Sequence, residues 1–175
     1  MFSNPEKILI QFGVSPDSVV ADFGTGSGFY AFLLSNKVGT KGKVFAVDVS
    51  KDMVRKISRE VERRHINNLE VIWGDLESKS GSGLKPKSVD SVIVANTLFT
   101  ISHKKIFVAE IKRVLRKKGR VLLVEWADSF AGMGPHRDHI IDREDAKKLF
   151  EDEGLVFDRY IEDAGEHHYG MVFRS

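Results

Sequence analysis

The sequence predicts an α/β protein in which helices cover both faces of a mostly parallel, seven-stranded sheet. Short apolar runs of strand length alternate with amphipathic helical patterns along most of the 175 residues. This alternation is typical of βαβ units in a doubly wound, three-layer αβα fold. The last two strand-like runs have no helix between them. One of these two strands is therefore expected to run antiparallel to the rest, as part of a C-terminal hairpin.

The first half of the chain repeats a helix-then-strand pattern three times, over residues 5–12, 18–23, 27–38, 43–47, 51–65 and 69–73. Pro5 suits the first position of a helix, because proline has no N–H to lose there. The run SVVADF is continuously apolar before its acid, as expected of a strand buried on both faces. In the third helix, apolar residues recur at helical spacing with Lys and Arg opposite them.

The second half begins with a loop rich in Gly, Ser, Lys and Pro and then resumes the alternation, over residues 79–87, 88–95, 103–117, 120–126, 142–153, 155–161 and 167–173. Asp142 is expected to cap the helix 142–153, which should end at Gly154. The segment 127–141 breaks the rhythm with two glycines and a proline.

Composition sets limits on the class of protein. Hydrophobic residues make up 42% and charged residues 30% of the chain, as in ordinary globular proteins. A net charge of +2 is too small to argue for nucleic acid or an anionic membrane. The absence of cysteine excludes disulfides, thiolate metal sites and a cysteine nucleophile. No apolar run could span a bilayer, and the start lacks a signal-peptide pattern. We therefore expect a single cytoplasmic domain, residues 1–175, of undetermined oligomeric state.

A glycine-rich turn between a strand and a helix, VVADFGTGSG at 19–28, is the strongest functional signal. Glycines there let a ligand lie against the backbone. Such a turn also suits a dinucleotide-binding enzyme, and Asp48 could serve an NAD ribose. However, Asp22 would repel a pyrophosphate and attract an ammonium group, and the Gly-x-Gly-x-Gly spacing differs from the dinucleotide fingerprint. Asp75 adds a third acid at a strand end, which favours a cationic nucleoside.

At this point the chain resembles the class I, Rossmann-like S-adenosylmethionine (SAM)-dependent methyltransferases. The matching stretches are VVADFGTGSG, VFAVDVS, VIWGDL, VDSVIVANTLF and EIKRVLRKKGRVLLVEW. The last looks most similar to the small-molecule methyltransferases of ubiquinone and menaquinone biosynthesis, although Lys117-Lys118-Gly119-Arg120 replaces their usual Lys-Pro-Gly-Gly. The resemblance implies SAM as cofactor, S-adenosylhomocysteine as its product, and cofactor binding by Asp22, Phe23, Gly24, Thr25, Gly26, Gly28, Asp48, Val49, Met53, Gly74, Asp75, Leu76, Asn96 and Thr97.

The resemblance also assigns parts of the cofactor to these residues. Asp22 and the turn would hold the methionine part, and Asp48 the two ribose hydroxyls, with Val49 and Met53 beside the adenine. Asp75 would bind the adenine amino group, with Leu76 against the ring. Asn96 and Thr97 would line the methyl-donor end.

The acceptor is less constrained. Asn96-Thr97-Leu98-Phe99 stands where methyltransferases of base amines or glutamine typically carry Pro-Pro-aromatic, and covalent cytosine methylation needs a cysteine. A small molecule is therefore the favoured acceptor. A protein side chain and a non-catalytic, SAM-binding partner subunit are the alternatives. Only residues 1–17 and the loop 127–141 are available to cover the site.

Positioning the acceptor in line with the methyl group can suffice for transfer, and a base is needed only when the acceptor must lose a proton early. The candidate bases are Glu125, at the end of a strand, and His136 and His168, which are predicted to face the acceptor. His139 and His167 are weaker candidates. No metal site is predicted, because adjacent histidines on a strand point to opposite faces. Aromatic residues near strand ends, such as Phe99, Trp126 and Phe130, could form an apolar acceptor pocket or pack beneath a loop.

Overall fold

The computed structural model describes residues 3–130, 132 and 134–175. Residues 1–2, in the predicted N-terminal cover, and residues 131 and 133, in the predicted substrate loop, lie outside the described residues. The elements in chain order are α1 (Pro5–Phe12), β1 (Val19–Phe23), α2 (Phe29–Val38), β2 (Lys43–Asp48), α3 (Lys51–Arg63), β3 (Leu69–Trp73), β4 (Val89–Ala95), η1 (Leu98–Thr100), α4 (Lys104–Val114), β5 (Leu115–Trp126), η2 (Arg137–His139), α5 (Arg143–Asp152), β6 (Val156–Tyr160) and β7 (His168–Arg174).

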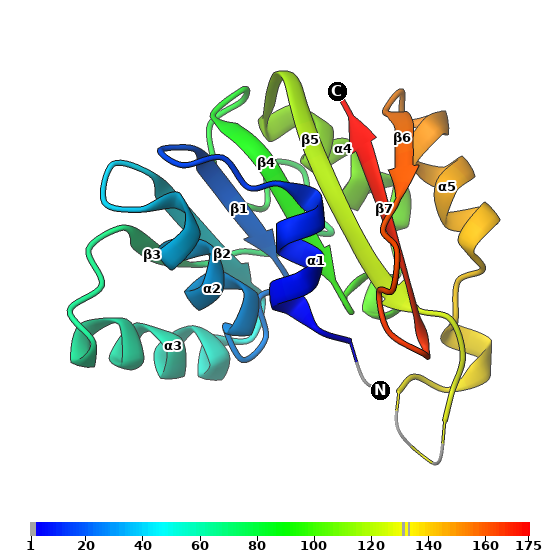
Figure 1. The fold of residues 1–175 in the computed structure, drawn as a ribbon, viewed down its shortest axis with the longest axis horizontal. Helices are drawn as coiled ribbons and strands as arrows, with labels where there is room; N and C mark the ends of the chain where they lie inside the picture. The colour runs from blue at the N-terminus through cyan, green and yellow to red at the C-terminus, as the bar shows by residue number, and fades with distance from the viewer. Residues whose placement is uncertain (1–2, 131, 133) are drawn as a thin grey trace.

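The predicted three-layer fold is confirmed (Figure 1). Seven strands form one sheet in the order β3-β2-β1-β4-β5-β7-β6. Neighbours from β3 to β5 pair in parallel, whereas β7 pairs antiparallel with both β5 and β6. The C-terminal hairpin is therefore β6–β7, and β7 is its antiparallel member. Helices α1 and α2 pack on one face of the sheet, and α4 and α5 pack on the other.

The central strands are apolar throughout because both of their faces are covered. In β1, Val20 belongs to the core under α1 and α2, whereas Ala21 and Phe23 belong to the core under α4 and α5. The same alternation recurs in β5, where Leu122 and Leu123 face opposite layers. Successive strand side chains point to opposite faces, so one continuous apolar run supplies both cores.

The predicted junction between helix 103–117 and strand 120–126 was wrong at both bounds. The sequence predicts helix through residue 117, but α4 ends at Val114 and β5 begins at Leu115. Leu115 is extended and buried, and it pairs with Val89 at the start of β4. The next pair is Ser91 with Arg120, so β5 contains extra residues at this point that have no partners in β4. Among them is Lys118, which has a φ of 67°. Burial of Leu115 in the sheet therefore overrides the helix-forming tendency of the basic residues that follow it.

The C-terminal end of α1 is held by contacts from distant parts of the chain. The Arg120 guanidinium donates to the carbonyls of Phe12 and Gly13 at 2.8 and 2.6 Å, and Arg159 donates to the Gln11 carbonyl at 3.0 Å. Cations at this end of a helix complement its free carbonyls and its dipole. The Gln11 amide also bonds to the backbone N–H and carbonyl of Glu162 at 2.8 and 2.5 Å. These bonds place the other end of α1 at the carboxyl ends of the strands.

None of the helices formed by the described residues has the length and apolar character to span a bilayer.

Candidate functional site

The glycine-rich turn connects β1 to α2 at the carboxyl edge of the sheet. Gly24, Gly26 and Gly28 have φ angles of 75°, 53° and 81°, in the left-handed region that glycine alone adopts readily. The N–H groups of Gly24 and of the following Thr25 both donate to the Val47 carbonyl, at 2.9 and 3.1 Å. A Cβ atom at Gly24 would lie 2.3 Å from Thr97 Cγ2. The turn is thus fixed against both neighbouring strands, and it leaves its backbone bare on the side facing the solvent.

Asp22 lies beneath this turn and is only 2% exposed. Its carboxylate accepts a 2.6 Å hydrogen bond from the Thr25 hydroxyl. Burial raises the pKa of Asp22 to about 7, with a smaller contribution from the nearby charge of Asp48. A carboxylate with this pKa gains most from a cation placed beside it, because the cation offsets the cost of keeping the charge buried.

Asp48 ends β2 and ties the turn to the start of α3. Its two carboxylate oxygens accept from the N–H groups of Gly26 and Ser50, each at 2.8 Å. The side chain is therefore held in one orientation, with acceptor lone pairs left for other donors. The indole of Trp73 donates to the Val49 carbonyl at 2.8 Å, which fixes the adjacent end of β3.

A first cavity of about 320 Å³ lies on the β2–β3 side of the turn. Its walls consist of Gly24, Gly26, Asp48, Val49, Gly74, Asp75, Leu76, Glu77, Asn96, Thr97, Thr100 and Ile101. Nine of these residues carry sequence-predicted roles in cofactor binding. Three other predicted residues line neither this cavity nor the second one described below: Phe23 is fully buried in the core, Gly28 is the N-cap residue of α2, and Met53 is an exposed residue of α3.

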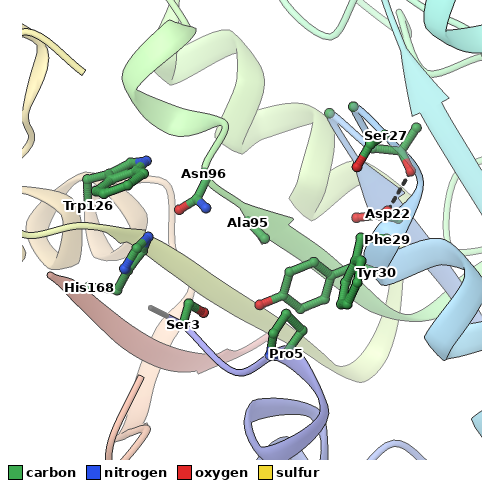
Figure 2. Close-up of a pocket in the computed structure, with 13 residues that line it drawn as sticks. Ser3, Pro5, Asp22, Ser27, Phe29, Tyr30, Ala95, Asn96, Trp126 and His168 are labelled. Carbon is green, nitrogen blue, oxygen red and sulfur yellow. Dashed lines mark hydrogen bonds between the residues drawn. The ribbon is translucent and has the colours of Figure 1, made fainter. Parts of the chain in front are cut away.

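A second cavity of about 420 Å³ lies on the β4–β5 side of the same turn (Figure 2). It shares Gly24, Gly26 and Asn96 with the first cavity. Its other lining residues are Ser3, Pro5, Asp22, Thr25, Ser27, Phe29, Tyr30, Ala95, Trp126 and His168. The two cavities therefore meet at the glycine turn, and Asn96, whose backbone has a φ of 52°, stands between them.

Glu125, a predicted base, is fully buried and lines neither cavity. Its carboxylate accepts from the N–H groups of Phe99 and Trp126, at 3.3 and 2.9 Å. Burial raises the pKa of Glu125 to about 7, and these backbone donors partly offset the increase. Glu125 thus supports the η1 turn from beneath.

The two predicted histidines lie in different surroundings. His168 lines the second cavity and packs on the Trp126 ring, with 4.2 Å between the ring centroids. His136 precedes η2 with a side chain that is 75% exposed, and it contacts Asp138 rather than either cavity. Within the described part of the chain, no three His, Asp or Glu side chains gather closely enough to hold a metal ion.

Sequence reasoning did not single out several wall residues, although Ser3 and Pro5 belong to the predicted cover 1–17. Ser3 and Pro5 reach the second cavity because α1 docks across the sheet, and Thr100 and Ile101 reach the first through the η1 turn. Neither placement has a local motif. Ala95, in contrast, is the last residue of β4, so its position at a strand end was a usable signal.

Comparison with known proteins agrees with this geometry. A methyltransferase-domain family model matches residues 15–154. A SAM-dependent methyltransferase from Aquifex aeolicus has a structure with a TM-score of 0.90 and 30% identity, covering 99% of this chain and 90% of that one. A type 11 methyltransferase from Sulfolobus solfataricus, described as putative, aligns with a TM-score of 0.80 at 22% identity, over 99% and 92% of the two chains, which supports the fold.

Curated relatives are similar over part of their length. An arsenite methyltransferase from Halobacterium salinarum is 31% identical over 63% of this chain and 27% of its own. A ubiquinone/menaquinone biosynthesis C-methyltransferase from Pseudomonas putida is 29% identical over 66% of this chain and 44% of its own. The chain thus spans less than half the length of these two relatives. The family match, the strand order and the cavity-lining acids together show that this chain belongs to the class I SAM-dependent methyltransferase family.

Proposed function

We propose that this chain transfers the methyl group of SAM to a small-molecule acceptor. The observation that carries the proposal is the pair of cavities joined at the glycine turn. Carboxylates from the ends of three successive strands, Asp22, Asp48 and Asp75, follow one another along the joined cavities. This order matches the ammonium group, the ribose and the adenine amino group of one extended ligand.

The donor set fits SAM residue by residue. The backbone of Gly24 and Gly26 borders both cavities without a side chain, and Asp22 beside it suits the ammonium group. Asp48 has fixed acceptor oxygens suited to two ribose hydroxyls. Asp75 and the buried Leu76 suit the polar edge and the face of adenine.

When bound, SAM supplies a methyl group that is already electrophilic on its sulfonium, so the chain has to bind, orient and shield the reactants. Ser3 and Pro5 close one side of the second cavity. Parts of the 127–141 loop line a neighbouring pocket that shares His168 with that cavity. We therefore propose that residues 1–17 and this loop cover the site of a single catalytic domain.

The shape of the second cavity favours a small acceptor. Its volume of about 420 Å³ lies in the range of small-molecule sites, which are concave and largely apolar. Phe29, Tyr30 and Trp126 supply aromatic walls (Figure 2). Part of this space would be taken by the methionine end of SAM, which leaves room for a compact acceptor.

Calorimetric titration with SAM, S-adenosylhomocysteine and NAD tests the cofactor assignment. Asp48→Ala should weaken binding of the first two on the order of 100-fold, because hydrogen bonds from two hydroxyls to a charged group are lost. Asp52→Ala, which removes an exposed acid paired with Arg55 on α3, is the matched control and should bind normally. Urea unfolding of both variants checks that the turn remains folded.

Failure of wild-type protein to bind either SAM or S-adenosylhomocysteine, or a preference for NAD, would overturn the proposal. Cofactor binding without methyl transfer to any small molecule, in a screen with tritiated donor, would point instead to a protein acceptor or to a non-catalytic partner subunit. A pull-down from cell extract, followed by methylation of the captured protein, separates these two alternatives.

A further inference from the structure

Two side chains of the second cavity hold buried polar atoms that lack hydrogen-bond partners. Among the described residues, the buried side-chain nitrogens and oxygens without a partner are the Tyr30 hydroxyl and both ring nitrogens of His168. Burial raises the pKa of Tyr30, and the nearby Ser3 side chain offsets part of this increase. No hydrogen bond of normal geometry joins the Tyr30 hydroxyl to Ser3. Unsatisfied buried groups are costly and rare in native proteins. Three such atoms in one cavity indicate a ligand that satisfies them.

These groups converge on the same space. Figure 2 shows the Tyr30 hydroxyl directed toward Ser3 and toward the side of the cavity where His168 and Trp126 lie. The glycine turn and Asp22 occupy the other side, where the methionine end of SAM is proposed to bind. The unpartnered atoms therefore belong to the part of the cavity that remains for the acceptor.

On the side of the second cavity, His168 is covered by a flat ring. It packs on Trp126 at an interplanar angle of 38°, and no Lys or Arg is among the described residues that line this cavity. Arg137 and Arg143 line the neighbouring pocket on the loop side of His168. His167 and Asp128 are the charged or titratable groups that act on it, and they pair with each other at 2.7 Å. Burial lowers the pKa of His168, followed by repulsion from His167, and the weaker effect of Asp128 does not reverse this. A lowered pKa favours the neutral ring, which has one nitrogen free to accept a proton.

We propose that His168 accepts the proton of an uncharged, planar acceptor that carries a hydroxyl group on its ring, with Tyr30 as a second polar anchor. This inference rests on the proposed function. An anionic acceptor would meet Asp22 and no Lys or Arg among the described residues of the second cavity, whereas a flat neutral ring can pack against Trp126.

A hydroxyl acceptor explains why a base would be present. The hydroxyl of a phenol has a pKa of roughly 10, as in tyrosine, so it is a weak nucleophile until it loses its proton. In the proposed step the acceptor oxygen bonds to the methyl carbon as the methyl–sulfur bond breaks. The electron pair of that bond stays on sulfur, giving S-adenosylhomocysteine, and the hydroxyl proton passes to His168 and then to solvent.

Binding of 2-naphthol, a fluorescent neutral hydroxyarene, tests this inference without requiring turnover. Titrations use protein saturated with S-adenosylhomocysteine, and 2-methoxynaphthalene, which cannot donate a hydrogen bond, is the comparison ligand. Wild-type protein should prefer the naphthol by about tenfold, as one added hydrogen bond predicts. His168→Phe, which keeps a flat ring on Trp126 but has no nitrogen acceptor, should remove this preference, and Tyr30→Phe should reduce it. His65→Asn, at an exposed histidine that follows α3 and lines neither cavity, should leave it unchanged.

His168→Leu, which likewise has no hydrogen-bond acceptor, serves as the second variant if the phenylalanine variant unfolds. An unchanged preference in a folded His168 variant would refute the role of this residue. Failure of wild-type protein to bind 2-naphthol, while it still binds S-adenosylhomocysteine, would refute the acceptor class. Loss of S-adenosylhomocysteine binding in the wild type would instead be a failure of the proposed function, so these outcomes are distinguishable.

Discussion

Replacement of Gly24 by alanine tests the close contact between the glycine turn and the end of β4. Two costs are expected to add. An alanine at a φ of 75° is strained by about 1–2 kcal/mol. Its Cβ would also lie 2.3 Å from Cγ2 and 2.4 Å from Oγ1 of Thr97, and such overpacking typically costs about 1–3 kcal/mol. The free energy of unfolding should therefore fall by roughly 2–5 kcal/mol.

Gly13→Ala separates the two costs. Gly13 has almost the same φ, 74°, but a Cβ atom there would meet only Arg120 Nη1, at 3.9 Å. This control should therefore show the strain alone. Adding Thr97→Gly to Gly24→Ala removes the contacting atoms, so a double-mutant cycle should give a coupling of about 1–3 kcal/mol between positions 24 and 97.

Urea unfolding at equilibrium gives these free energies, and titration with S-adenosylhomocysteine shows whether the turn still binds ligand. In Gly24→Ala the affinity should fall, because either Thr97 or the ligand must move away from the new methyl group. If Gly24→Ala costs no more than Gly13→Ala, or if the cycle shows no coupling, the reasoning about this contact is wrong.

Three further predictions concern charged side chains. Asp22→Asn should weaken S-adenosylhomocysteine binding, measured by calorimetry. In the wild type this affinity should rise from pH 6 to 8, because Asp22, with a pKa of about 7, loses its proton over this range. An asparagine side chain does not titrate, so Asp22→Asn should abolish this pH dependence. Because the Glu125 pKa is raised from 4.5 to about 7, the folded state holds that proton longer than the unfolded state. The free energy of unfolding of the wild type should therefore fall as the pH rises from about 4.5 to 7. Glu125→Gln lacks this titration, so urea unfolding should show its free energy of unfolding increasing relative to that of the wild type over this range, by up to roughly 3 kcal/mol. Arg113→Met should lower the free energy of unfolding by about 3–5 kcal/mol, because Glu110, which is 3% exposed, loses its ion-pair partner. Adding Glu110→Gln removes the buried charge and should restore part of this stability.

The fold could be predicted from sequence because its signals are local. Each strand is a short apolar run, and the acids proposed to bind the cofactor stand at or just after strand ends, so their position at one edge of the sheet follows from parallel pairing alone. The start of β5 could not be predicted in this way. Leu115 is placed in the sheet by its pairing with Val89, a contact that no nearby residue specifies.

The acceptor side of the site was only partly predictable for the same reason. Asn96 and His168 stand at strand ends, where sequence can place them. Ser3 reaches the cavity because Arg120 and Arg159, more than 100 residues away in the chain, hold the far end of α1. Tyr30 faces the cavity because α2 starts directly from the left-handed Gly28, which sets the orientation of the helix. Such placements depend on tertiary packing, which periodicity does not encode.

The docking of α1 has a practical consequence for anyone handling the protein. Its start lies at the cavity, with Ser3 and Pro5 in the wall, whereas β7 ends at the opposite edge of the sheet, where the Ser175 N–H bonds to the Gly119 carbonyl (Figure 1). An affinity tag or fusion partner joined ahead of Ser3 would emerge beside the second cavity, where the acceptor is proposed to bind, and would be in a position to block it. The same addition after Ser175 would leave from the remote edge, so recombinant material for acceptor screens is best tagged at the C-terminus.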